Sequence, residues 1–137
     1  MERRILVVED NSDDEFLALR ALRRLGLHNV LVVRDGEEAL SCLVCAGLSS
    51  GEAVEPPWLV LLDLKLPKVD GMDVLQAVRE QPSTKALPVI VISSSQEERD
   101  VRRCRELGVL SYITKPVESE KIADALRCAG LMTGDPA

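Results

Sequence analysis

Residues 58–63 read Trp58-Leu59-Val60-Leu61-Leu62-Asp63, a continuous apolar run that stops at a carboxylate. A run without polar alternation predicts a strand, Trp58–Leu62, that is buried on both faces. Strands of this kind occur in parallel sheets that are covered by helices on both sides. Asp63 then follows the strand at its carboxyl end, which is the edge where ligands bind in open α/β sheets.

The same alternation of a short apolar run and an amphipathic segment recurs along the whole chain. Five strands are predicted, at Ile5–Val8, Val30–Val33, Trp58–Leu62, Val89–Ile92 and Ser111–Ile113. The helices are expected from Ser12 or Asp13 to Gly26, from Asp35-Gly36 with Leu43 and Val44 inward, around Val74 and Val78, over roughly Gln96–Leu107, and at the end with Ile122, Ala125, Leu126 and Ala129 inward. This order predicts an α/β fold, a doubly wound five-stranded parallel sheet with helices on both faces. Residues 47–57 predict a loop, and residues 133–137 a frayed tail.

Composition narrows the function before any motif is considered. The net charge is −6, and Phe16, Trp58 and Tyr112 are the only aromatic residues, so a nucleic-acid surface is not expected. No apolar run approaches the ~18–20 residues that span a membrane, and no signal-peptide pattern opens the chain. The four cysteines then predict reduced thiols and a cytoplasmic protein.

Polar residues follow four of the five predicted strands. They are Glu9-Asp10, Asp63, Ser93-Ser94 and Thr114-Lys115. Each has an ordinary explanation when taken alone: Asp10 as a helix N-cap, Ser93 as a loop residue, Lys115 as an exposed lysine. Together they place three carboxylates, a hydroxyl and an ammonium at one sheet edge. Three adjacent carboxylates need a cation, and Mg²⁺ suits such oxygen ligands. A carboxylate beside this ion is a competent nucleophile for phosphorus.

Four segments resemble the bacterial two-component response-regulator receiver domain. They are Ile5-Leu6-Val7-Val8-Glu9-Asp10-Asn11, Leu61-Leu62-Asp63-Leu64-Lys65-Leu66-Pro67, Val89-Ile90-Val91-Ile92-Ser93-Ser94-Ser95 and Ser111-Tyr112-Ile113-Thr114-Lys115-Pro116. The resemblance covers residue 4 to about residue 128 and implies the flavodoxin-like strand order 2-1-3-4-5. It also implies a stand-alone receiver domain over residues 1–130, with a short tail at 131–137 and no output domain.

The resemblance assigns a role to each residue at the sheet edge. It implies that Asp63 accepts a phosphoryl group from a sensor histidine kinase. Mg²⁺ would be held by Glu9, Asp10, Asp63 and the backbone carbonyl of Lys65. The phosphoryl group would be bound by Ser93 and Lys115, and Tyr112 would swing inward behind Ser93. The Lys115-Pro116 bond is expected to be cis, and Gly71 to be a tight-turn residue near the phosphorylation loop.

A narrower resemblance is to the response regulators that accompany bacterial phytochromes. It rests on the insert at 47–57, the segment Asp35-Gly36-Glu37-Glu38-Ala39-Leu40, and Ser111-Tyr112. It implies a red-light-sensing histidine kinase as partner, and a homodimer that forms through the fourth helix, fifth strand and fifth helix. The receiver function in general implies that the same surface switches for phosphorelay or for binding a downstream protein. The apolar stripe of the fourth helix, Val101, Cys104 and Leu107, is narrow enough to shift when the site changes.

Three alternatives remain open. A phosphohydrolase of the haloacid-dehalogenase type also forms an aspartyl phosphate, but it needs an acidic residue where this chain has Lys65. A pseudo-receiver that binds partners without phosphorylation is disfavoured by the intact set of site residues. Cys42 and Cys45 have redox-motif spacing, yet they lie late in a helix, where nothing activates a thiolate.

Overall fold

The computed structural model describes residues 3–45 and 56–132 and shows one parallel sheet of five strands in the order β2-β1-β3-β4-β5. The strands are β1 (Ile5–Val8), β2 (Val30–Val33), β3 (Leu59–Asp63), β4 (Val89–Ser93) and β5 (Ser111–Thr114). The predicted fold class and strand order are confirmed. β3 begins one residue later than predicted, and β3, β4 and β5 each end one residue later.

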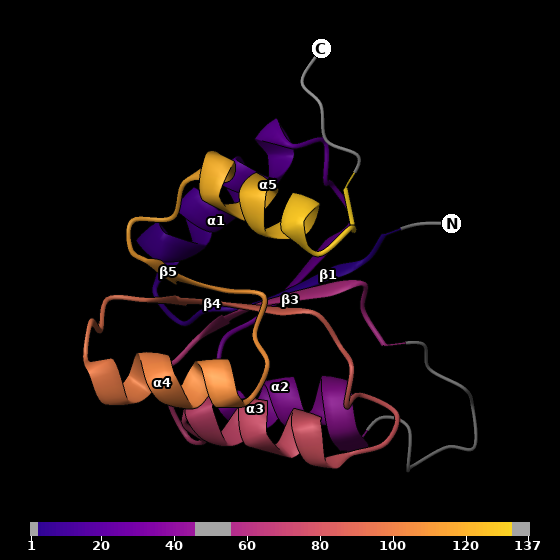
Figure 1. Ribbon diagram of the computed structural model, residues 1–137, viewed down its shortest axis with the longest axis vertical. Coiled ribbons are helices and arrows are strands. Elements are labelled where there is room, and N and C mark those ends of the chain that lie inside the picture. The colour runs from indigo at the N-terminus through magenta and orange to yellow at the C-terminus, as the bar shows by residue number, and fades with distance from the viewer. Residues whose placement is uncertain (1–2, 46–55, 133–137) are drawn as a thin grey trace.

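Helices cover both faces of this sheet (Figure 1). They are α1 (Ser12–Arg24), α2 (Gly36–Leu40), the π-helical segment η1 (Ser41–Cys45), α3 (Gly71–Glu80), α4 (Glu98–Glu106) and α5 (Ser119–Cys128). α1 and α5 lie on one side of the sheet, and α2, α3 and α4 on the other. No helix within the described residues is long and apolar enough to span a membrane.

Alternate strand residues form two separate cores, because successive side chains of a strand point to opposite faces. Leu61 and Ile90 pack with Leu22 and Leu126 under α1 and α5. Their neighbours in sequence pack under α2, α3 and α4, as Leu62 does with Leu75. Residues of β1, β3 and β4 are therefore buried on both faces, which explains their unbroken apolar sequence.

Besides the strand ends, three sequence predictions differ from the structure. η1 continues α2 as a π-helix. It buries Leu43 as expected, while the side chains of Val44 and Cys45 lie outside the described residues. β2 is the edge strand that the predicted order implies, and its Leu31 is accordingly 46% exposed. Ala129 is exposed because α5 ends at Cys128, and Ala123 is buried instead. α4 is shorter than predicted. The predicted loop at 47–57 lies mostly outside the described residues, and the tail at 133–137 wholly so.

The strand register brings the predicted site together. Val8 pairs with Leu62, and Asp63 pairs with Ile92. Ser93 pairs with Thr114 at the other side of β4. The carboxyl ends of these strands are therefore level, and the residue that follows each strand lies at the same edge.

Candidate functional site

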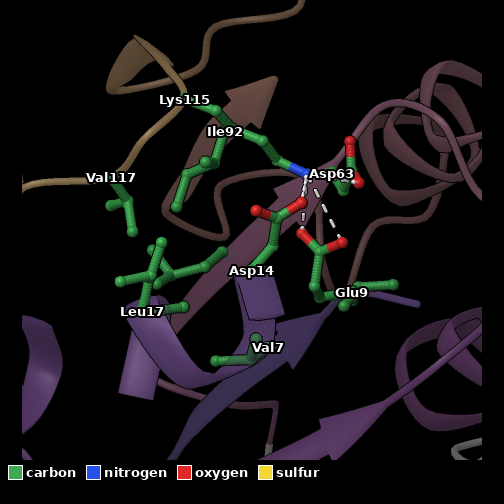
Figure 2. A pocket seen from close by; sticks show the side chains of 11 residues that line it. Val7, Glu9, Asp14, Leu17, Asp63, Ile92, Lys115 and Val117 are labelled. Atoms are coloured by element: carbon green, nitrogen blue, oxygen red, sulfur yellow. Dashed lines mark hydrogen bonds and ion pairs between the residues drawn. The ribbon is translucent and has the colours of Figure 1, made fainter. Parts of the chain in front are cut away.

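The side chains of Glu9, Asp63 and Lys115 meet at the carboxyl edge of the sheet (Figure 2). The Nζ atom of Lys115 lies 3.0 Å from Oδ2 of Asp63 and 3.1 Å from Oε2 of Glu9. The Lys115 side chain is only 15% exposed. Lys115 is therefore not an ordinary surface lysine, and its ammonium partly balances the buried carboxylates.

Glu9, Asp10 and Asp63 form a group of carboxylates suited to a metal ion. One oxygen from each lies within 4.8 Å of the others. Glu9 and Asp63 are buried and Asp10 is exposed, so such a group would be open to solvent on one side. This set of hard oxygen atoms fits Mg²⁺, which retains several waters when proteins bind it. Asp10 is not the N-cap of α1, because Asn11 accepts the capping hydrogen bond from the backbone of Asp14.

Burial perturbs the ionisation of this group. Burial first, and then the charge of Asp63, raise the pKa of Glu9 to about 7. Burial alone would lower the pKa of Lys115, but hydrogen bonds to Asp14, Asp63 and Glu9 outweigh it and raise that pKa overall. The ammonium therefore stays charged, whereas Glu9 holds its proton more tightly than an exposed glutamate does.

The loop after β3 fixes the two oxygens of Asp63 in different surroundings. Oδ2 faces Lys115, while Oδ1 accepts a hydrogen bond from the backbone N–H of Lys65 at 3.1 Å. The N–H of Gly71 closes the loop on the carbonyl of Leu64 at 2.8 Å. A Cβ on Gly71 would lie 2.2 Å from the carbonyl oxygen of Asp63. Gly71 thus permits a close approach of two backbone segments, and the positive φ in this loop belongs to Lys68.

The predicted switch residues, Ser93 and Tyr112, lie on β4 and β5, on the other side of β3 from β1. Ser93 is fully buried, and its Oγ accepts a hydrogen bond from the backbone N–H of Ser95 at 3.0 Å. The Tyr112 hydroxyl donates to the carbonyl of Ser95 at 2.8 Å. The peptide bond between Lys115 and Pro116 is cis, as predicted. Each predicted site residue is therefore at or next to this edge, except that the Lys65 side chain points to solvent.

Asp14 belongs to the site, although sequence reasoning did not identify it. Its Oδ2 lies 2.7 Å from Nζ of Lys115, closer than the oxygens of Asp63 and Glu9. The only sequence signal was an acidic residue one helical turn after Asp10. Acidic residues are common in the first turn of any helix, so this signal did not stand out.

The three cysteines with described side chains show no sign of activation. Cys42, Cys104 and Cys128 are free thiols, and Cys45 lies outside the described side chains. Burial first, and then the charge of Glu38, raise the pKa of the half-buried Cys42. A raised pKa lowers the fraction of reactive thiolate, which favours an inert thiol.

Comparison with known proteins gives the same family from sequence and from structure. The sequence model of the "Response regulator receiver domain" family matches residues 5–127. "Response regulator Rcp1" of Synechocystis sp. (strain ATCC 27184 / PCC 6803 / Kazusa) is 39% identical over 81% of this chain and 75% of its own length. "Probable methanogenesis regulatory protein FilR2" of Methanothrix harundinacea is 40% identical over 86% of this chain and 75% of its own length.

Solved structures resemble the chain over almost its whole length. The "Bacteriophytochrome response regulator RtBRR" has a TM-score of 0.83 and 43% identity, covering 98% of this chain and 82% of its own. The Mn²⁺-bound form of Rcp1 has a TM-score of 0.78 and 34% identity, covering 98% and 99%. The phosphorylated cyanobacterial phytochrome response regulator RcpA has a TM-score of 0.77 and 34% identity, covering 100% of both chains.

Proposed function

The chain belongs to the response regulator receiver domain family, whose members a histidine kinase phosphorylates on an aspartate, and we propose that Asp63 is the phosphoacceptor. The observation that carries this proposal is the ammonium of Lys115, held 3.0 Å from an oxygen of Asp63. A carboxylate next to a fixed cation can attack phosphorus while the developing charge is balanced. The match over residues 5–127 supports a receiver domain of residues 1–130.

The proposed reaction moves one phosphoryl group. An oxygen of Asp63 bonds to the phosphorus of the kinase phosphohistidine, and the P–N bond breaks. The bonding electron pair stays on the imidazole nitrogen, which then takes up a proton. Lys115 and Ser93 bind the phosphoryl oxygens and hold them in position. The protein thus supplies mainly alignment and charge balance, as phosphoryl transfer requires.

Glu9, Asp10, Asp63 and the backbone carbonyl of Lys65 are the proposed ligands of Mg²⁺. The group of three carboxylates within 4.8 Å supports this assignment. A bound Mg²⁺ would supply positive charge to the phosphoryl oxygens. The Mn²⁺-bound form of Rcp1, a protein of similar structure, supports divalent-metal binding.

Phosphorylation would change the surface formed by α4, β5 and α5. Tyr112 lies on β5 and borders a groove with Val101 and Arg105 of α4. Movement of Ser93 toward a phosphoryl group would alter the space beside Tyr112 and repack this groove. The readout is partner binding, dimerisation or onward phosphotransfer.

The similarity to RtBRR and RcpA supports a bacterial phytochrome as the cognate kinase. This part of the proposal is tested with two purified donors, a phosphorylated bacterial phytochrome and an unrelated histidine kinase. Transfer at least about tenfold faster from the phytochrome is the expected result. Equal rates from both donors contradict the assignment.

The phosphoacceptor is tested with acetyl phosphate and Mg²⁺, followed by intact mass measurement. Wild type should gain the mass of one phosphoryl group in a base-labile form, and Asp63→Asn should gain none. Asp70→Asn is the matched control, because Asp70 is exposed and makes no side-chain capping bond. An unmodified wild type with both acetyl phosphate and a kinase donor would leave a pseudo-receiver as the better description. Sustained release of phosphate from unrelated phosphoesters would favour the phosphohydrolase.

A further inference from the structure

Asp14 provides the shortest contact that Lys115 makes. The distance from Nζ is 2.7 Å to Asp14, against 3.0 Å to Asp63 and 3.1 Å to Glu9. Figure 2 shows Asp14 pointing at the Lys115 ammonium, which also lies beside the carboxylates of Glu9 and Asp63. One ammonium thus meets three carboxylates, and Asp14 is the only one of them outside the proposed metal-binding group.

The position of Asp14 is set by its helix. The backbone N–H of Asp14 donates to the side chain of Asn11 at 2.9 Å, which fixes the first turn of α1. An acidic side chain in this turn also interacts favourably with the helix dipole. The carboxylate is therefore presented from a capped helix rather than from a flexible loop.

The pair between Asp14 and Lys115 is sheltered. The side chains are 30% and 15% exposed, whereas those of the surface pair Glu98 and Arg102 are 87% and 66% exposed. Solvent and salt screen a partly buried pair much less than an exposed one. The side chains of Leu17 and Val117 line the small cavity that Asp14 and Lys115 also line. They restrict the positions that the aliphatic part of the Lys115 side chain can occupy.

The three carboxylates have different roles once metal and a phosphoryl group are bound. Glu9 and Asp63 are proposed to bind metal, and Asp63 also becomes an acyl phosphate. Asp14 has neither task. An ammonium carries three protons, so Lys115 can donate one to Asp14 and still donate to phosphoryl oxygens.

We propose that Asp14 is a positioning residue for Lys115, which holds the ammonium beside Asp63 before and during phosphoryl transfer. This inference rests on the proposed phosphorylation of Asp63. It adds a residue of α1 to a site whose other members lie at or just after the carboxyl ends of β1, β3, β4 and β5. Without Asp14, Lys115 would have only the two carboxylates that the loaded site uses for other purposes.

The kinetic test compares Asp14→Ala with Asp13→Ala. Asp13 lies on the same helical turn, carries the same charge and is exposed, so it is a matched control. With acetyl phosphate and fixed Mg²⁺, phosphorylation of Asp14→Ala should be about 10-fold slower than wild type, and that of Asp13→Ala should stay within about 2-fold. Asp14→Asn, which keeps the side-chain shape, should show a smaller loss and guards against misfolding. Equal rates for the Asp14 and Asp13 variants overturn the proposal.

A double-mutant cycle separates positioning from a general structural effect. In a Lys115→Met background, Asp14→Ala should slow phosphorylation no further, because the group it positions is gone. The same fold-loss in both backgrounds would show that Asp14 acts by another route, and the proposal would be wrong.

A third measurement does not depend on phosphorylation. The chain has five lysines, so the side-chain ammonium signal of Lys115 can be assigned in ¹⁵N-lysine spectra by comparison with Lys115→Met. Asp14→Ala should broaden or shift this signal, and Asp13→Ala should leave it unchanged. An unchanged signal in Asp14→Ala would show that Asp14 does not position the Lys115 ammonium, and the proposal would be wrong. Failure of wild type to become phosphorylated would instead remove the proposed function, while the ammonium signal still decides the role of Asp14.

Discussion

The hydroxyl of Tyr112 donates a hydrogen bond of 2.8 Å to the backbone carbonyl of Ser95. Ser95 in turn donates its backbone N–H to Ser93 and its hydroxyl to Asp100 of α4, at 3.0 Å and 2.9 Å. One residue therefore connects the proposed switch hydroxyl, the ring on β5 and the first turn of α4. A displacement of Ser93 would reach both the ring and the helix through Ser95.

Substitution of Tyr112 should uncouple α4 from the phosphorylation site. On addition of a stable acyl-phosphate analogue with Mg²⁺, the amide chemical shifts of α4 should change in wild type and change little in Tyr112→Ala. Tyr112→Phe keeps the ring but loses the bond to Ser95, so it should retain part of the response. Ser94→Ala is the control, since Ser94 is exposed. A full response in Tyr112→Ala would rule out this coupling.

Arg79 should stabilise the fold, although it lies outside the proposed phosphorylation site. Its guanidinium donates to the carbonyls of Leu107 at 2.6 Å and Leu87 at 2.7 Å, and to others nearby, which ties α3 to the ends of two other elements. Arg79→Met should lower the free energy of unfolding by about 2–4 kcal/mol, because it strands these carbonyls. Arg102→Ala, which breaks an exposed pair, should cost at most about 0.5 kcal/mol. Urea unfolding measures both, and equal losses would contradict the prediction.

Gly26→Ala and Gly71→Ala should lower the free energy of unfolding by different amounts. Gly26 has a φ of +77° and an open space around it, so Gly26→Ala should cost only about 1–2 kcal/mol of backbone strain. Gly71→Ala adds a clash with the Asp63 backbone, so its cost should exceed that of Gly26→Ala, and it should also slow phosphorylation of Asp63. Thermal unfolding and acetyl phosphate kinetics test this pair. Wild-type phosphorylation kinetics in Gly71→Ala would show that the loop can move away at no functional cost.

The metal-free protein should become less stable as pH rises through the titration of Glu9. Its pKa is raised from 4.5 to about 7, so between these values the folded protein keeps a proton that the unfolded chain has released. The free energy of unfolding therefore falls as pH rises through this window. Urea unfolding in EDTA should show this fall for wild type relative to Glu9→Gln, which cannot titrate there. Parallel pH profiles for the two proteins would contradict the assignment.

Mg²⁺ should remove this pH dependence. Binding favours the ionised form of Glu9, because the ligand of the metal is the carboxylate. Without metal, the difference in the free energy of unfolding between wild type and Glu9→Gln should fall with a slope of about one proton between pH 5 and pH 7. With saturating Mg²⁺ this difference should no longer fall over the same range.

Sequence patterns predicted the strands well because burial on two faces leaves a distinct signature. The unbroken runs of β1, β3 and β4 were placed to within one residue at either end. Helical ends were less predictable, since a periodic pattern does not say where hydrogen bonding changes. The π-helix after Leu40 and the end of α5 before Ala129 are examples, because both depend on how the last turn packs against the sheet.

The sequence by itself determined the order of strands and helices, and which polar residue follows each strand. Parallel strands of similar length place these residues at one edge, so Glu9, Asp63, Ser93 and Lys115 could be grouped without coordinates. Only the tertiary structure decided which carboxylate reaches Lys115 most closely. Asp14 and Lys115 are 101 positions apart, and their 2.7 Å contact depends on how α1 docks beside the segment after β5. Docking of this kind results from the packing of whole helices against the sheet, which no local pattern of residues records.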